Sequence, residues 1–220
     1  MKIYFFMCGC IIGSFLNVLV SRSIAKENFI CGRSHCEFCY RTLSWYELIP
    51  VFSYLFLLGR CRTCQIKLPF YLFWYELAAG IVLINFTWSQ ALFLITLQII
   101  SLFDLFSFEF PGFYLLPLFT FAFLNNQISS LGLGLTLLVY LILTIANHFL
   151  KFIGNGDLDV FLAIVINFDP LILTKTVLIA SIFALISCII KRIKVIPLVP
   201  YLYFGLLANL LINKWIIFFN

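Results

Sequence analysis

Apolar residues fill this chain in long runs that are interrupted by short groups of polar residues, glycine or proline. A helix that crosses a bilayer needs about 20 such residues. Eight predicted helices follow, at 3–20, 70–86, 91–106, 113–124, 131–150, 158–168, 171–190 and 195–212. The runs 113–124 and 158–168 are short and need tilt or neighbouring helices to complete a crossing. The pattern predicts an all-α polytopic membrane protein with about eight transmembrane helices.

One stretch of 46 residues, 22–67, breaks the pattern with seven Lys and Arg residues and cannot lie in lipid. The sequence therefore predicts a first transmembrane helix at 1–21, a small polar domain at 22–68 and a membrane core at 69–220. The first apolar run carries no charge and no small-residue cleavage site before a soluble domain. We expect it to be retained and not removed as a signal peptide.

The composition excludes a water-soluble globule. Hydrophobic residues make up 64% of the 220 residues and charged residues 10%, against about 45–50% and about 25% in soluble domains. The apolar runs are also longer than the alternating segments of a membrane β-barrel. The net charge of +5 is modest, and we expect it to report orientation in the membrane and not nucleic-acid binding.

Basic residues predict that orientation, because cytoplasmic loops are enriched in Lys and Arg. If the polar domain is cytoplasmic, eight helices place 11 of the 14 Lys and Arg residues inside. Only Lys2, Lys175 and Lys214 are then outside. We expect a multi-pass protein of the cytoplasmic membrane with its N-terminus outside. The basic residues beyond the polar domain that fall inside are Lys151, Lys191, Arg192 and Lys194.

Four cysteines of the polar domain have the spacing of a metal site. Cys36 and Cys39 form one CxxC pair, and Cys61 and Cys64 form another after 21 intervening residues. Two such pairs can close a tetrahedral four-thiolate zinc site that has no open position for chemistry. So small a domain cannot bury a hydrophobic core large enough to be stable alone. We therefore expect zinc to be a structural ion that stabilises its fold.

Alternatives to this site remain open at the level of sequence. The cysteines can form disulfides instead, although a cytoplasmic location disfavours them. Cys31 or His35 also lies near enough in sequence to replace a ligand. The remaining cysteines, Cys8, Cys10 and Cys188, lie in apolar runs and are expected to be inert packing residues.

Asp104 and Asp157 are the acids that the predicted topology brings together. Asp104 ends the third helix and Asp157 precedes the sixth, so both fall on the cytoplasmic side. Carboxylates at such positions are costly and are functional candidates by default. Two that lie close together share one proton and can activate water against a carbonyl, as in aspartic proteases. The alternative is that Asp157 only caps a helix and Asp104 is an interfacial residue.

Gly154 and Gly156 stand in the sequence Gly-Asn-Gly-Asp just before the second acid. Glycine adopts backbone conformations closed to other residues and allows close approach of another chain. We therefore predict that both glycines shape a cleft for an extended peptide. Among other polar residues, we expect Glu109 to be solvated, Glu76 to be a buried polar partner or a cofactor contact, and His148 to be interfacial or a neighbour of the acids.

Several motifs follow one another along the chain: the sequence Gly-Ser-Phe-Leu-Asn-Val at 13–18, both CxxC pairs, Pro69, Glu76, Asp104 seven residues before Pro111, and Gly154 to Asp157. Taken in order, these motifs resemble the type IV prepilin peptidase family of GxGD-type membrane aspartic proteases. Two positions depart from the family pattern, because Asp159 replaces a usual lysine and Gly112 a usual acid. The short chain is more similar to the competence-pilus version.

The resemblance implies a peptidase that removes the basic leader of prepilin or pseudopilin precursors at the cytoplasmic face of the membrane. It implies Asp104 and Asp157 as the catalytic pair. Many members also methylate the new N-terminus with S-adenosylmethionine, but no motif assigns residues of this chain to that cofactor. Asp159 would add a third negative charge near the pair.

Two other functional classes remain open. A multi-span transporter also places acids at helix ends and interrupts helices with glycine, but it does not explain the CxxC pairs. A non-enzymatic pilus-assembly factor would use the zinc domain to recruit a partner. Prepilin-like precursors and the lipid bilayer are the expected partners.

Overall fold

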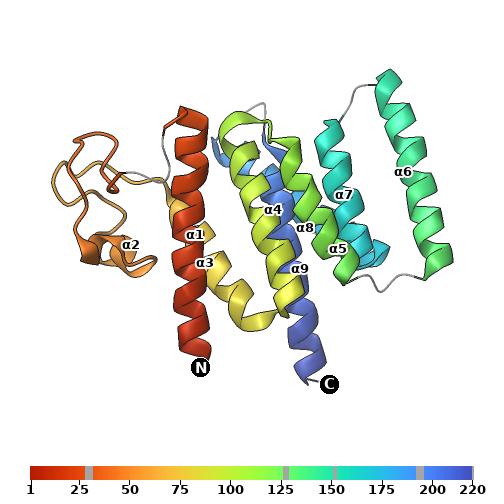
Figure 1. Ribbon diagram of the computed structural model, residues 1–220, viewed down its shortest axis with the longest axis horizontal. Coiled ribbons are helices and arrows are strands. Elements are labelled where there is room, and N and C mark those ends of the chain that lie inside the picture. The colour runs from red at the N-terminus through yellow and green to blue at the C-terminus, as the bar shows by residue number, and fades with distance from the viewer. Residues whose placement is uncertain (28–31, 126–128, 151–152, 192–195, 220) are drawn as a thin grey trace. The chain divides into compact units, whose positions relative to one another are not determined.

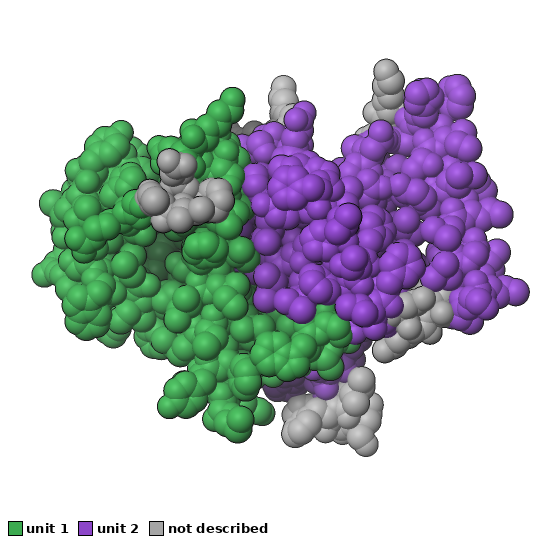
Figure 2. All heavy atoms as spheres, viewed as in Figure 1, with its two compact units in different colours: residues 1–91 green, residues 92–220 purple. Residues whose placement is uncertain are grey.

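The computed structural model describes residues 1–27, 32–125, 129–150, 153–191 and 196–219. This part of the chain is helical and contains no strand, so the predicted all-α class is confirmed for it. The chain divides into two compact units, Met1–Ala91 and Leu92–Asn220 (Figures 1 and 2). The sequence-based division at residues 21 and 68 rests on polarity and remains a prediction.

Unit 1 is built on two helices that pack closely, α1 (Lys2–Ala25) and α3 (Phe70–Asn85). A Cβ atom at Gly9 would lie 2.4 Å from the carbonyl oxygen of Ala79, and one at Gly13 would lie 2.9 Å from the Ala79 Cβ. Only glycine lets the two backbones approach so closely, which is a common way to pack helices in a bilayer.

The polar segment between these helices is anchored to them by Glu76 of α3. The carboxylate of Glu76 accepts a hydrogen bond from the Val51 N–H at 2.7 Å and one from the Ser14 hydroxyl of α1. Val51 has a φ of 64°, a strained value for a β-branched residue. Of the two roles expected for Glu76, this contact supports the buried polar partner. The segment also contains η1 (Trp45–Leu48) and α2 (Phe52–Phe56).

Unit 2 is a bundle in which α7 (Asn155–Asn167) contacts four other helices. Its partners are α5 (Leu115–Leu124), α6 (Ser130–Leu150), α8 (Pro170–Lys191) and α9 (Leu198–Phe219). Most of α4 (Trp88–Ser107) also belongs to this unit, and η2 (Gly112–Tyr114) leads into α5. The Tyr203 hydroxyl of α9 donates to the Gln98 side chain of α4 at 3.0 Å, which ties these two helices together.

Eight of the described helices match the eight predicted apolar runs. Four of them, α1, α4, α6 and α8, are long and apolar enough to cross a membrane by themselves. Eight crossings therefore remain a prediction. One boundary changes the view of the site, because α7 begins at Asn155 and not at Leu158. Asp157 thus lies in the first turn of a helix and not before it.

Candidate functional site

The first CxxC pair is held in a tight turn. The Cys36 N–H donates to the carbonyl of Arg41 at 3.0 Å, and the Tyr40 N–H donates back to the Cys36 carbonyl at 2.8 Å. Tyr40 has a φ of 54°, which turns the chain back immediately after Cys39. These contacts direct both thiols to one side of the turn.

The second pair repeats this turn 25 positions later. The Cys61 N–H donates to the Ile66 carbonyl at 2.9 Å, the Gln65 N–H donates to the Cys61 carbonyl at 3.0 Å, and Gln65 has a φ of 56°. The backbone N–H groups of Cys64 and Thr63 lower the pKa of the Cys61 thiol to about 6. Two copies of one turn, each presenting a CxxC pair, are typical of a metal-binding pair of knuckles.

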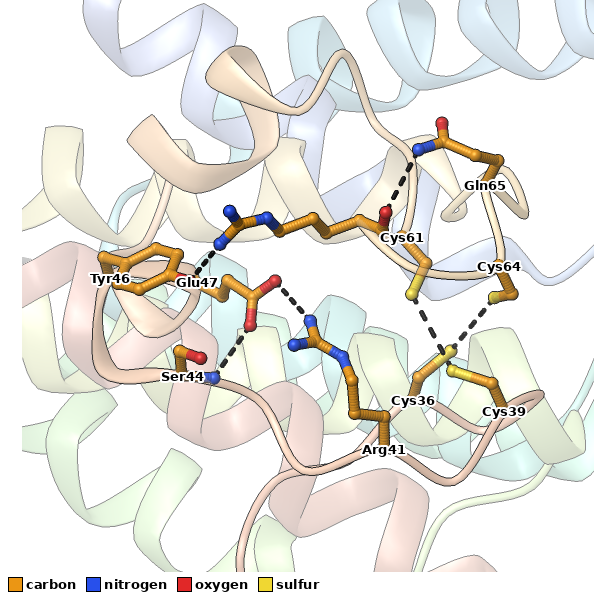
Figure 3. Close-up of polar contacts among 10 residues, drawn as sticks. Cys36, Cys39, Arg41, Ser44, Tyr46, Glu47, Cys61, Cys64 and Gln65 are labelled. Carbon is orange, nitrogen blue, oxygen red and sulfur yellow. Dashed lines mark hydrogen bonds and ion pairs between the residues drawn. The ribbon is translucent and has the colours of Figure 1, made fainter.

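The four thiols converge on one point (Figure 3). All four Sγ atoms lie within 4.8 Å of one another, with Cys36 to Cys64 at 3.8 Å and Cys39 to Cys61 at 4.0 Å. Zn–S bonds of about 2.3 Å would separate the sulfurs of a tetrahedron by about 3.8 Å. A disulfide would need about 2.05 Å, and the four cysteines are free thiols. The donor set and its spacing fit zinc.

The alternative ligands do not join the cluster. His35 is exposed, and its ring lies 3.3 Å from the carbonyl of Arg33. Cys31 lies outside the described residues, as do the basic residues Lys151, Arg192 and Lys194 of the predicted topology. The expected inert cysteines differ in exposure, with Cys8 exposed, Cys10 buried and Cys188 partly buried.

An ion pair supports the segment between the knuckles. Arg41 contacts Glu47 at 2.5 Å, and the Ser44 N–H donates to the other oxygen of Glu47 at 2.8 Å (Figure 3). Burial acts to raise the pKa of Glu47, but the hydrogen bonds from Ser44 and Arg41 outweigh it and leave this pKa below its usual value. Arg62 binds the Tyr46 hydroxyl beside this pair.

Asp104 lies in the last turn of α4 and is only 6% exposed. Its Oδ2 accepts a hydrogen bond from the Val199 N–H at 2.9 Å, and its carboxylate also accepts one from the Leu198 N–H. These are the first N–H groups of α9, which have no partner inside that helix. The positive end of the helix dipole and two hydrogen bonds therefore stabilise a carboxylate at this position.

Asp157 occupies the third position of α7, three residues after the N-cap Gly154. Its carboxylate accepts a hydrogen bond from the Gly154 N–H, which is one half of a capping box. The alternative in which Asp157 is itself the N-cap is therefore wrong in detail, although the residue does stabilise the start of the helix.

The two acids approach each other within unit 2. The carboxyl groups of Asp104 and Asp157 are close enough to interact electrostatically, although 53 positions separate them in the chain. Asp104 is buried and Asp157 is half-buried. This arrangement agrees with the predicted approach of the two acids, and their catalytic role remains a prediction.

Gly154 and Gly156 are required by the limited room for a Cβ atom and not by their backbone conformation. A Cβ at Gly154 would lie 3.1 Å from Oδ2 of Asp157, and a Cβ at Gly156 would lie 2.6 Å from Cζ of Phe110. Neither glycine has a positive φ. The expectation that these glycines adopt conformations closed to other residues is therefore wrong, and their predicted contact with substrate is untested.

The remaining polar residues near the two acids differ in their contacts and exposure. Asp159 accepts a hydrogen bond from the Tyr140 hydroxyl of α6, so its charge has a partner on that helix. Glu109 is exposed, as expected. The His148 ring contacts Phe149. Its neighbour Asn147, which the sequence did not single out, binds the segment before Asp157.

Comparisons with known proteins agree with the motifs. Residues 7–90 match the family described as Bacterial Peptidase A24 N-terminal domain. The chain is 29% identical to a prepilin leader peptidase/N-methyltransferase of Vibrio cholerae over 99% of this chain and 96% of the relative.

Two further relatives match over shorter segments. A prepilin leader peptidase/N-methyltransferase of Myxococcus xanthus is 35% identical over 41% of this chain and 28% of its own length. A type 4 prepilin-like proteins leader peptide-processing enzyme of Escherichia coli is 33% identical over 42% of each chain. No solved structure matches the chain.

Proposed function

We propose, from the resemblance of this chain to type IV prepilin peptidases over nearly its whole length, that it is a membrane-embedded aspartic endopeptidase. Its substrates would be type IV prepilin-like precursors, from which it removes the basic leader at the cytoplasmic face. The electrostatic interaction of Asp104 with Asp157 is the observation that carries this proposal. It is what a pair of acids that shares one proton requires.

We propose different roles for the two acids, on the basis of their hydrogen bonds. Asp104 accepts two backbone N–H groups from the start of α9, whereas Asp157 accepts one. Hydrogen bonds to the charged form favour ionisation, so Asp104 is the ionised member and Asp157 holds the shared proton. Oδ2 of Asp157 lies beside the space that Gly154 leaves free of a side chain.

The reaction then uses both acids. Asp104 takes a proton from a water molecule, and the water oxygen attacks the carbonyl carbon of the scissile bond. Asp157 donates its proton to the carbonyl oxygen as charge develops there. Collapse of the tetrahedral intermediate breaks the C–N bond, and the proton held by Asp104 passes to the leaving amine. A hydroxyl group of the intermediate returns one proton to Asp157 as the new carboxyl group forms. Both acids thus end in the states that they had at the start.

Zinc at the four cysteines is proposed as a structural ion. A four-thiolate site is closed and supplies folding free energy without an open position for substrate. Its place in the segment that Glu76 anchors to α1 and α3 suits a domain that holds the precursor near the membrane.

The relatives' names also state a second activity, that of an N-methyltransferase. Glu76, a half-buried carboxylate of unit 1, already accepts two hydrogen bonds from within the unit, and no motif assigns residues of this chain to S-adenosylmethionine. Addition of one methyl group to the cleaved product, read by mass spectrometry, tests this activity separately from cleavage.

The test of the peptidase uses purified protein in lipid and a peptide with a basic leader before an apolar helix. Asp104→Asn and Asp157→Asn each keep an oxygen for the backbone N–H groups, so both variants retain the helix caps and should fold. Both should abolish cleavage, while the control Glu109→Gln, at an exposed acid five residues after Asp104, should cleave normally. Cleavage by either asparagine variant at the wild-type rate would refute the pair.

The same experiment separates the alternative functions. A transporter that uses the acids as ion sites, or an assembly factor without catalysis, would leave the peptide intact. Only the peptidase shortens it.

A further inference from the structure

Asn147 binds the backbone just before the second acid through three hydrogen bonds. Its Nδ2 donates to the Ile153 carbonyl at 2.7 Å and to the Asn155 side-chain oxygen at 3.0 Å. Its Oδ1 accepts the Ile153 N–H at 3.1 Å. One side-chain amide therefore satisfies both backbone polar groups of Ile153, in the way that a neighbouring strand would.

Only a few residues separate the backbone that Asn147 binds from Asp157. Ile153 precedes Gly154, the N-cap of α7, and the Gly154 carbonyl accepts hydrogen bonds from the N–H groups of Asp157 at 3.1 Å and Leu158 at 3.4 Å. The Gly154 N–H in turn binds the Asp157 carboxylate. A residue that fixes Ile153 therefore also fixes the N-cap that positions this carboxylate.

A second contact aligns the same two helices. Tyr140 on α6 donates to Asp159 on α7, and α6 and α7 pack side by side (Figure 1). Tyr140 and Asn147 are two helical turns apart and share one face of α6, while Asn155 and Asp159 are one turn apart on α7. We call these four residues the polar seam. Asp157 lies between the two seam residues of α7 and points away from them, because positions two apart on a helix do not share a face.

We infer that Asn147 is a positioning residue for the acid pair, an inference that rests on the proposed peptidase function. The seam holds one face of α7 against α6. The opposite face of α7 therefore presents Asp157 to Asp104 at a fixed position along the helix axis. Asp159, the departure from the family pattern, is part of this seam. Its charge is directed to the Tyr140 hydroxyl and not to the acid pair.

The expected effect is on the chemical step. Loss of the Asn147 amide frees Ile153 and lets the Asp157 carboxylate shift relative to Asp104. A misplacement of about 1 Å can cost about a hundredfold in rate, so Asn147→Ala should lower kcat by at least about tenfold and leave KM unchanged. Asn155→Ala removes only one of the three hydrogen bonds and should give a smaller loss.

The experiment compares these variants with Thr144→Ala as a matched control. Thr144 lies one turn before Asn147 on α6 and bonds the Leu141 carbonyl of its own helix. Cleavage of the leader peptide gives kcat and KM, thermal unfolding reports the global fold, and hydrogen exchange reports residues 153–158. The inference predicts faster exchange there and a lower kcat in Asn147→Ala, with an unfolding temperature like that of Thr144→Ala.

Two results would overturn the inference. One is a kcat of Asn147→Ala equal to that of Thr144→Ala. The other is unchanged exchange at 153–158, which would show that Asn147 does not hold this segment. If the wild type fails to cleave any leader peptide, the proposed function is wrong, and the exchange result still decides whether Asn147 fixes the start of α7.

Discussion

Asp104 and Asp157 each use a carboxylate to satisfy backbone N–H groups at the start of a helix. For Asp104 that helix is α9, which begins 94 positions later in the chain. Hydropathy and motif order predicted both acids and their approach. They did not predict the Leu198 and Val199 N–H groups, because nothing in a local pattern marks which helix start will face a distant acid. The binding of Ile153 by Asn147 was missed for the same reason.

Gly156 offers a test of packing beside the acids. In Gly156→Ala the new Cβ would lie 2.6 Å from the Phe110 ring, and such overpacking costs about 1–3 kcal/mol. We expect Gly156→Ala to lower the unfolding temperature and the rate of leader cleavage. Phe110→Ala in the same chain should restore part of both, because it removes the atoms that clash.

Gly134→Ala is the control for that prediction. Gly134 lies in α6, and a Cβ there would meet no atom within 4 Å. Alanine also favours a helix more than glycine does, so this variant should be at least as stable as the wild type. If both variants behave alike, the contact with Phe110 does not constrain Gly156.

At the scale of whole elements, apolar length predicted which segments are helices better than it predicted their ends. The helix α1 continues to Ala25, five residues past the end of the apolar run, and stops where Lys26 adopts a φ of 57°. Hydropathy locates the limit of lipid, whereas a helix ends where its backbone hydrogen bonds end. The same difference placed Asp157 outside its helix in the sequence-based prediction.

The two knuckles predict how the polar segment depends on metal. Each is fixed by its own hydrogen bonds, and a shared ion would join them through their four thiols. The wild type should contain one zinc ion per chain by elemental analysis, and Cys36→Ser should lose it and give less folded protein. Cys188→Ser, in α8, is the control and should keep the metal. Full zinc content in Cys36→Ser would contradict the four-thiolate site.

The Arg41–Glu47 pair predicts a pH dependence within the same segment. A native pKa below the usual value means that Glu47 stabilises the fold above the unfolded-state pKa of about 4.3, and that this contribution is lost as pH falls through the native pKa. Glu47→Gln should therefore unfold at a lower temperature than the wild type at pH 7. The difference should shrink steadily below about pH 4.

Glu27→Gln is the control for this titration. Glu27 is exposed just after α1. Its replacement should leave the unfolding temperature unchanged at pH 7 and in acid. A difference between Glu47→Gln and wild type that stays constant into acid would show that the charge of Glu47 is not what stabilises the segment.

At the scale of the whole molecule, the proposed pairing of the two acids restricts the topology of unit 2. Asp104 ends α4 and Asp157 begins α7, so α5 and α6 either both cross the membrane or both do not. The apolar helix of residues 112–124 has 13 residues, which rise about 20 Å against a hydrocarbon core of about 30 Å. By contrast α6 is long enough to cross alone. Parity then requires that the short helix also crosses, with tilt or local thinning of the bilayer.

Reporter fusions test this requirement. In the eight-helix topology, alkaline phosphatase fused after Asn125 should be active outside the cell, and a fluorescent protein fused after Leu150 or Leu68 should fold inside. A fusion at Asn220 should report the outside, because an even number of crossings leaves both termini on one side. An inactive phosphatase after Asn125 would mean that the short helix does not cross. By parity α6 would then lie along the membrane surface, against the length and apolar character that predict it to span.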